Sequence, residues 1–529
     1  MPGKNILLVE PGYKNKYPPL GLMKIAQYHG PQGKKDNVTF VKGAEKSVLD
    51  KPWDRIYVTT LFSFEWKKIS EAIDFAILAA GGQRTNVFVG GIAASLMHQA
   101  FLDEKKWHGV RFIKGLLNTA PAKSLRLDPF EEELYSDDVK GNHIEDLIPD
   151  YSILDQTEYK YPVHDAYFAY ASRGCVRKCS FCGVPKLEGD LYDTPSLSTI
   201  VEGIEKLYGP KKDMILMDNN VVASPRFKEI IAEIRDLGFT PGAKLKRGRI
   251  PVQRRVDFNQ GVDARILCKD PMFLRQLASI CTDPLRIAFD HLGFRKAYEA
   301  SIRFAYEAGL KNLSNYMLYN FHDTPEDLYA RMWLNIELNE ELGIRIFSFP
   351  MRYQPTDMKD RSHVGTNWNK YYLRSMQLIL HATHGIVSGA PTFFKRAFGG
   401  NSEEFENLLT KPHKYIFNRT WFEELDGKPE LEDFQAQFHR LSSSDRVELL
   451  HALMAFDTNT KYDYAKSLIS NSKVASIFHF YVPLTHDEEA AIWEKQKTLR
   501  SSMLEQVLVP DDQRVEDAGL ELEPVLEKN

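Results

Sequence analysis

Short apolar segments alternate with helical patterns in the first part of the chain. Residues 5–9, 38–41, 55–59, 86–89 and 110–113 are rich in β-branched and apolar side chains and predict five strands. Between two of these runs, Ile69, Ile73, Ala76 and Ile77 recur at helical spacing. Five strands separated by helices predict a flavodoxin-like, doubly wound α/β domain with its ligand crevice at the carboxyl ends of the strands.

A second alternating series begins near residue 166. Its predicted strands cover residues 166–171, 214–217, 256–259, 285–289, 313–319 and 344–349. Six βα units predict a partial (βα)6 barrel of the TIM type, with chemistry on the loops at the carboxyl edge. After about residue 360 helical patterns dominate, as in 371–381 and 445–456, and predict an α-helical C-terminal domain.

Charge and composition divide the chain further. Residues 126–150 hold nine acidic and two basic side chains, and the last twenty residues hold seven and two. We therefore expect domains over 1–120, 163–358 and 359–509, joined by an acidic linker over 121–162 and followed by a disordered acidic tail over 510–529.

The whole chain is nearly neutral, with a formal charge of -4 over 529 residues. This balance argues against a strongly cationic nucleic-acid binder and against an acidic disordered chain. No apolar run of about eighteen residues is present, and the first residues lack the pattern of a signal peptide. We expect a cytoplasmic protein with reduced thiols and no membrane association.

Three of the five cysteines, Cys175, Cys179 and Cys182, lie within eight residues on the loop after the first strand of the second series. Three thiolates so spaced can bind one inorganic centre. A structural zinc ion would need a fourth ligand, and the next candidates, Cys268 and His291, belong to distant strands. A cubane held by three thiolates leaves one iron open to an exogenous ligand.

The C-x3-C-x2-C motif, with Phe181 before its last cysteine, resembles the radical S-adenosylmethionine (SAM) superfamily. The resemblance implies that the three cysteines bind a 4Fe-4S cluster and that Phe181 packs near the adenine of SAM. It further implies reductive cleavage of SAM to a 5'-deoxyadenosyl radical, and an electron donor such as flavodoxin or ferredoxin.

Further positions match that superfamily more weakly. Asp218 and Asn220, at the end of the second strand, stand where it places the group that holds the SAM amino nitrogen, although the usual Gly-Gly-Glu is absent. Arg265 is a candidate for the SAM carboxylate or ribose. The same cavity would be lined by Arg286, Asp290 and Asn320. For each of these residues a structural ion pair or hydrogen bond is the alternative.

An α/β domain before such a barrel resembles the cobalamin-binding subclass. Thr59, Gly90 and Gly91 occupy the positions where that subclass admits the nucleotide tail of cobalamin, so the resemblance leaves cobalamin binding open. The Asp-x-His-x-x-Gly motif for the lower cobalt ligand is absent. Gly90 and Gly91 could equally make a tight turn in a domain without cofactor. Methylthiotransferases share the architecture, but they need N-terminal cysteines, and this chain has none before Cys175.

One basic segment leaves its interpretation open. Residues 241–255 carry six cations and no acid: Lys244, Lys246, Arg247, Arg249, Arg254 and Arg255. They predict either contacts to the phosphates of a nucleotide or RNA, or a solvated connection. The second is favoured because no aromatic side chain lies among them.

These features predict a radical SAM enzyme that acts on an unidentified small-molecule or peptide substrate. Cobalamin-dependent C-methyl transfer is one outcome. The alternatives are a cobalamin-independent radical modification or rearrangement of a metabolite or nucleotide, and a non-catalytic metal-bound interaction module.

Overall fold

The computed structural model describes residues 3–117, 144–456 and 461–506, with side chains as far as residue 498. These residues fall into two compact units. The first comprises the chain up to Ala288, Phe294–Asn315 and Tyr353–His363, and the second comprises Phe289–Gly293, Tyr316–Arg352 and the chain from Val364. The predicted acidic linker is described only from residue 144, and the predicted tail lies outside the described residues; the other domain boundaries stay predictions.

The first five strands form one parallel sheet in the order β2-β1-β3-β4-β5. This is the flavodoxin-like order, in which the strand sequence reverses between β1 and β3. The strands are β1 (Asn5–Glu10), β2 (Asn37–Lys42), β3 (Arg55–Thr60), β4 (Val87–Gly91) and β5 (Arg111–Phe112). The connecting helices are α1 (Leu20–His29), α2 (Trp66–Ala79), α3 (Ile92–Leu96) and α4 (His98–Leu102).

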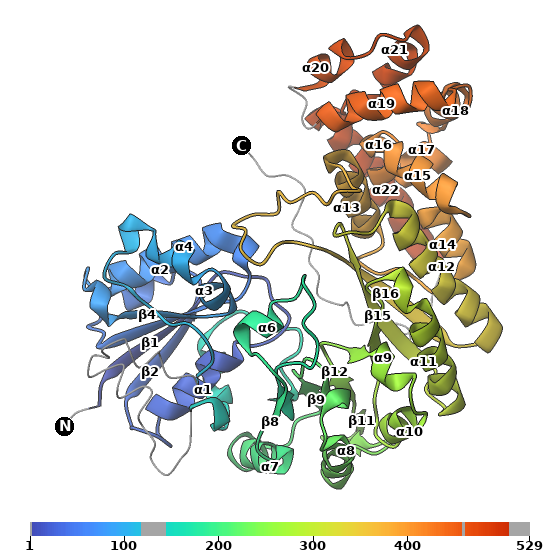
Figure 1. Ribbon diagram of the computed structural model, residues 1–529. Helices are drawn as coiled ribbons and strands as arrows, with labels where there is room; N and C mark the ends of the chain where they lie inside the picture. Colours follow the sequence, from blue (N-terminus) through green and yellow to red (C-terminus); the bar gives the residue numbers. More distant parts are fainter. Residues whose placement is uncertain (1–2, 118–143, 457–460, 507–529) are drawn as a thin grey trace. The chain divides into compact units, whose positions relative to one another are not determined.

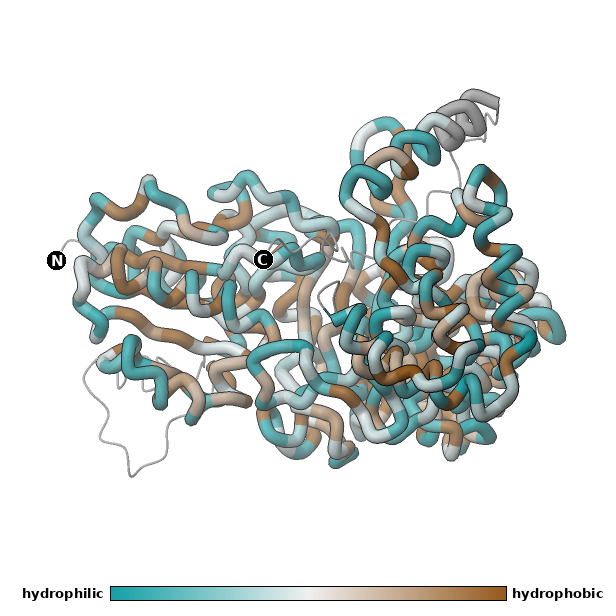
Figure 2. The backbone as a smooth tube through the Cα atoms, turned by 90° about the horizontal axis from the view of Figure 1, so that it is seen from above, coloured by the Kyte–Doolittle hydropathy of each residue, from teal (hydrophilic) through white to brown (hydrophobic). Residues whose placement is uncertain are grey.

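The apolar strands of this sheet are buried because helices cover both of its faces. Figure 1 shows α1 on one face and α2, α3 and α4 on the other. Leu7 and Val9 of β1 pack with Ile69 and Ile73 of α2 in one core, whereas the alternate side chains of β1 point to the opposite face. The hydropathy colours of Figure 2 show the corresponding brown stretches, bordered by hydrophilic loops.

The second βα series contains all six predicted strands, but they do not form one sheet. β6 (Ala166–Ala169), β9 (Asp213–Leu216) and β12 (Val256–Phe258) make a parallel sheet in the order β12-β9-β6. A short strand, β13 (Val262–Asp263), pairs with β14 (Leu285–Ala288), and β14 pairs with the start of β15 (Asn312–Tyr319). Between the two sheets the described backbone makes only an isolated bridge, Val256 to Thr282.

Helices and two small hairpins accompany these strands. The helices are α6 (Val184–Leu187), α7 (Leu197–Tyr208), α8 (Phe227–Asp236), α9 (Ala264–Leu267), α10 (Met272–Ala278) and α11 (Arg295–Glu307). The hairpins pair β7 (Ser172–Arg173) with β8 (Tyr192–Asp193), and β10 (Lys244–Leu245) with β11 (Val252–Gln253).

The second unit holds the end of β15, the next strand β16 (Arg345–Arg352) and a series of helices, as the sequence predicts. Its helices are α12 (Pro325–Leu342), α13 (Lys370–Ala382), α14 (Pro391–Phe398), α15 (Ser402–Thr410), α16 (His413–Phe417), α17 (Arg419–Glu424), α18 (Lys428–His439), α19 (Ser443–Ala455), α20 (Tyr462–Ser467), α21 (Ser472–Phe478) and α22 (His486–Gln506). Among the helices of the described residues, none combines the length and the apolar composition that crossing a bilayer requires.

Candidate functional site

The three clustered cysteines lie on the loop that connects β7 to α6, at the carboxyl edge of the β12-β9-β6 sheet. All three are half-buried free thiols. The backbone closes the base of the loop, because β7 pairs with β8 and the Cys175 N–H donates to Gly189 O at 3.3 Å. Gly174 has a φ of 71°, and a Cβ there would lie 2.1 Å from Asp190 O. Only glycine therefore fits at this position.

Several N–H groups point at the sulfur atoms. Backbone N–H groups donate to two of them, from Arg177 to Cys175 Sγ at 3.3 Å and from Val184 to Cys182 Sγ at 3.4 Å. The Asn220 side-chain amide lies 3.9 Å from Cys175 Sγ. Hydrogen bonds of this kind stabilise thiolates and tune the potential of an iron-sulfur cluster.

The donor set suits a cluster better than a single ion. Across residues 3–117, 144–456 and 461–506, no three Cys, His, Asp or Glu side chains come together closely enough to hold one metal ion. The thiolates of a 4Fe-4S cluster bind different iron atoms, so they need not converge on one point. Three half-buried thiols on one closed loop, with donors at their sulfur atoms, fit that requirement.

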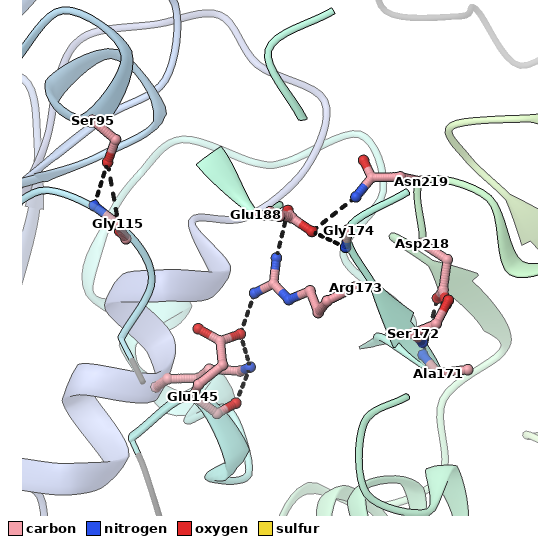
Figure 3. A network of polar contacts seen from close by, with 11 residues as sticks. Ser95, Gly115, Glu145, Ala171, Ser172, Arg173, Gly174, Glu188, Asp218 and Asn219 are labelled. Carbon is pink, nitrogen blue, oxygen red and sulfur yellow. Dashed lines mark hydrogen bonds and ion pairs between the residues drawn. The ribbon is translucent and has the colours of Figure 1, made fainter. Parts of the chain in front are cut away.

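A buried polar network holds both ends of the cysteine loop (Figure 3). Glu188, which follows the loop, accepts from Gly174 N at 2.8 Å, from Arg173 Nη1 at 3.0 Å and from Asn219 Nδ2 at 2.8 Å. Arg173 also binds Glu145, which pairs with Lys24 of α1 at 2.9 Å. Burial opposes ionisation of Glu145, but the two cations lower the pKa of its carboxyl below the usual value. The network connects the N-terminal sheet's first helix to the loop.

Asp218 and Asn220 follow β9 at the same edge of the sheet, and both are buried. The Asp218 carboxylate accepts from Ala171 N at 3.0 Å and from the N–H and hydroxyl of Ser172. Burial raises the pKa of Asp218 to about 6, against the effect of these hydrogen bonds. Asn220 Oδ1, by contrast, is buried without a hydrogen-bond partner among the described residues. An unpaired acceptor beside Cys175 fits the ammonium group of a SAM molecule.

Arg265 lies beside the cysteine loop, held there by Asp263. Asp263 accepts from Arg265 Nε at 2.8 Å and Nη2 at 3.0 Å, and from Nε of Arg177, a residue of the cysteine loop, at 2.7 Å. Burial opposes the charge of Arg265, but Asp263 and the nearby Cys179 raise the pKa of its guanidinium. Although burial opposes ionisation, the two arginines lower the pKa of the Asp263 carboxyl.

The sequence patterns do not identify three neighbours of the cysteine loop: Asp263, Glu188 and Asn219. A signal for Asp263 was present, because an Asp at a strand end directly before a helix is a typical N-cap. Its side chain does accept from Arg265 N at 2.9 Å. Glu188 and Asn219 have no such local signal, because they bind each other from positions 31 residues apart in the sequence.

The remaining predicted SAM residues are distributed between the units. Arg286 forms a buried bidentate pair with Asp257, with both N–O distances 2.8 Å. Asp290 and Asn320 belong to the second unit, where Asp290 accepts from Leu318 N and Asn320 accepts from Gly365 N. Phe181 is half-buried on the cysteine loop. Their contacts to a cofactor stay predictions.

The residues predicted to admit cobalamin, Thr59, Gly90 and Gly91, contact other parts of the protein. Thr59 and Gly90 are paired between β3 and β4, as are Thr60 and Gly91. A Cβ on Gly91, whose φ is 103°, would lie 2.4 Å from Thr60 O. The close approach of the Thr60 backbone explains why a glycine stands at position 91, and this explanation requires no cofactor.

The basic segment forms the β10–β11 hairpin. It leads into the amino end of β12, the edge of the sheet opposite the cysteine loop. Three of its six cations interact with neighbouring groups of the protein. Arg247 pairs with Asp165, Arg254 lies over the ring of Phe239, and Arg255 pairs with Asp283. The exposed remainder comprises Lys244, Lys246 and Arg249. Three of the six predicted cations therefore interact with other groups of the protein, and the other three are exposed.

Comparison with known proteins gives short, distant similarities, and no protein-family profile matches the chain. The ribosomal protein uS12 methylthiotransferase RimO of Xanthomonas oryzae pv. oryzae (strain PXO99A) is 33% identical over 78 residues, 15% of this chain and 16% of that protein. The protein of the same name from Chlorobaculum parvum (strain DSM 263 / NCIMB 8327) is 25% identical over 184 residues, 32% of this chain and 36% of that protein. The chain thus spans 16% to 36% of the length of these relatives. It is distantly similar to a radical SAM enzyme.

Proposed function

We propose that this protein is a radical SAM enzyme with one 4Fe-4S cluster, held by Cys175, Cys179 and Cys182. The observation that carries the proposal is the arrangement of three half-buried thiols on one closed loop at the carboxyl edge of a parallel sheet, with N–H donors at their sulfur atoms. The distant similarity to RimO supports the same superfamily.

A bound 4Fe-4S cluster supplies the electron that splits SAM into methionine and a 5'-deoxyadenosyl radical, which takes a hydrogen atom from a substrate carbon. The protein's own residues orient these groups. Glu188 keeps the ends of the cysteine loop together, Asp263 directs Arg265 toward Cys179, and Asn220 offers an acceptor to the SAM ammonium group. An electron donor of the flavodoxin or ferredoxin class would deliver the electron.

The proposal does not extend to sulfur insertion. The relatives are named as methylthiotransferases, but beyond the loop this chain offers only Cys268 and Cys281 as further cluster ligands. Between the remaining outcomes, we favour a cobalamin-independent radical conversion over cobalamin-dependent C-methyl transfer.

Anaerobic reconstitution tests the proposal. We expect a brown protein with about four irons per chain, which releases 5'-deoxyadenosine from SAM in the presence of dithionite. Cys179→Ser should lose both properties, while Cys268→Ser, a matched substitution outside the loop, should keep them. A colourless zinc-binding chain that releases no 5'-deoxyadenosine would instead indicate a metal-bound interaction module.

A further inference from the structure

The carboxyl ends of β1 and β2 carry a buried ion pair. Glu10 and Lys42 are the last residues of these strands and stand side by side in the sheet. Lys42 Nζ lies 2.9 Å from Glu10 Oε2, and the two side chains are 5% and 2% exposed. In a doubly wound domain, this edge of the sheet is where a ligand binds.

The loop from β1 to α1 closes over the pair. Asn15 donates to Glu10 Oε1 at 2.8 Å and accepts from Lys42 Nζ at 2.6 Å. Tyr161 donates its hydroxyl to Glu10, and Lys42 lies 4.4 Å from the ring centroid of Tyr159. Every side chain of this cluster is thus held by another, and the two charges are compensated away from water.

A further side chain of the same loop covers the switch point between β1 and β3. Tyr13 is 3% exposed, and its ring lies edge-on to that of Phe62, at 5.7 Å between centroids. Its hydroxyl accepts from Leu61 N, just beyond the end of β3, at 3.4 Å. The place where a flavodoxin-like domain receives its cofactor is therefore filled by the protein's own aromatic ring.

The loop is also fixed to the second sheet. Tyr17 donates to Asn259, directly after β12, at 2.6 Å, and its ring packs edge-on against Phe168 of β6. Moving the loop aside for a ligand would break these contacts as well as those of Glu10 and Lys42.

We propose that the N-terminal domain does not bind cobalamin, because the Glu10–Lys42 pair and the loop carrying Tyr13 permanently close its ligand crevice. The domain instead braces the carboxyl edge of the β12-β9-β6 sheet through Tyr17. Combined with the proposed function, a closed crevice in the N-terminal domain removes corrinoid-mediated methyl transfer and leaves a rearrangement or another radical conversion.

Two measurements on the full chain test this, and neither depends on the cluster or on SAM. After incubation with hydroxocobalamin and gel filtration, the protein should carry no corrinoid absorbance. In native chemical acetylation read out by mass spectrometry, Lys42 should be protected at least tenfold relative to Lys14, an exposed lysine of the same loop. The protection should not change when hydroxocobalamin is added.

Retention of about one corrinoid per chain would overturn the proposal. Labelling of Lys42 as fast as Lys14 would also overturn it, since the crevice would then open in solution. Loss of SAM cleavage in the same preparation would count only against the proposed function.

Discussion

Two side chains outside the cysteine loop lie close to it: the Asn220 amide nitrogen is 3.9 Å from Cys175 Sγ, and Asp263 binds Arg177 of the loop and Arg265. The cysteines themselves could be predicted from spacing alone, because three ligands on one short loop leave a local pattern. Asp263 could not be identified as their neighbour in this way. Its hydrogen bonds reach Arg177 and Arg265, which are far apart in the sequence and meet only in the folded chain.

Replacing Asn220 by Ala should weaken SAM binding while the cluster still forms. The loss of one hydrogen bond to a charged group costs about 1.5–3 kcal/mol, which corresponds to roughly 10–100-fold in the dissociation constant. Titration of the reduced, reconstituted protein with SAM, followed by the change in its electron paramagnetic resonance spectrum, measures this. Asn219→Ala is the matched control, since Asn219 binds Glu188 instead. Equal losses in both variants would contradict the role of Asn220.

Asp263→Asn should raise the midpoint potential of the reconstituted cluster. The substitution removes a negative charge near the cysteine loop and leaves the two cations Arg177 and Arg265, and this change in net charge favours the reduced state. A redox titration monitored by electron paramagnetic resonance gives the potential. Asp190→Asn, which removes an exposed partner of Lys178 in the same region, should leave it unchanged because exposed pairs are screened. An unaltered potential in Asp263→Asn would show that the charge of Asp263 does not act on the cluster.

At the scale of elements, periodicity identified every long strand but not how the strands divide between sheets. β7, β10 and β13 contain two residues each, too few to show a period. The separation of the β12-β9-β6 sheet from β14 depends on backbone pairing after Asn259, where Gly261 has a φ of 81°. Such pairing is decided by long-range contacts, which residue patterns do not encode.

Gly174→Ala tests whether the closed base of the cysteine loop is required for cluster binding. An added Cβ would collide with the backbone at Asp190, so the loop ends must separate. We expect the iron content after reconstitution to fall severalfold with far-UV circular dichroism unchanged. Gly189→Ala is the control: Gly189 also has a positive φ, 77°, but its Cβ would meet open space. It should cost only about 1–2 kcal/mol of backbone strain and retain iron; the same loss in both variants would show that strain alone suffices.

At the scale of the whole molecule, each unit contains a histidine whose pKa is lowered by burial, and we expect it to contribute to the response of that unit to acid. His29, in the first unit, contacts Asp36 at 2.7 Å and Tyr57 at 3.0 Å, and burial lowers its pKa to about 4. His413, in the second, stacks on Tyr371 with ring centroids 4.1 Å apart, and burial lowers its pKa to about 3.

Each histidine should therefore reduce the stability of its unit as the pH falls, although in the first unit the raised pKa of Asp218 acts in the opposite direction below about pH 6. Between about pH 6.5, where an unfolded histidine titrates, and the lowered native pKa values, the unfolded chain binds more protons. The free energy of unfolding should decrease by up to about 1.4 kcal/mol per pH unit for each histidine. Hydrogen exchange of peptides from each unit at pH 7, 6 and 5 measures the slope separately. His29→Asn should flatten it in the first unit only; a slope that persists there would exclude His29 as its source.

The pair between Lys24 and Glu145 has a consequence for how the chain is made. Its partners are 121 positions apart, and Tyr161 completes the Glu10–Lys42 cluster from 151 positions away. At roughly 5–20 residues per second of synthesis, several seconds pass between the synthesis of the N-terminal sheet and the synthesis of these partners. Until residues 144–161 emerge, the nascent domain holds buried charges without their final compensation. Its folding is thus finished by a segment synthesised later, just before the cysteine loop follows.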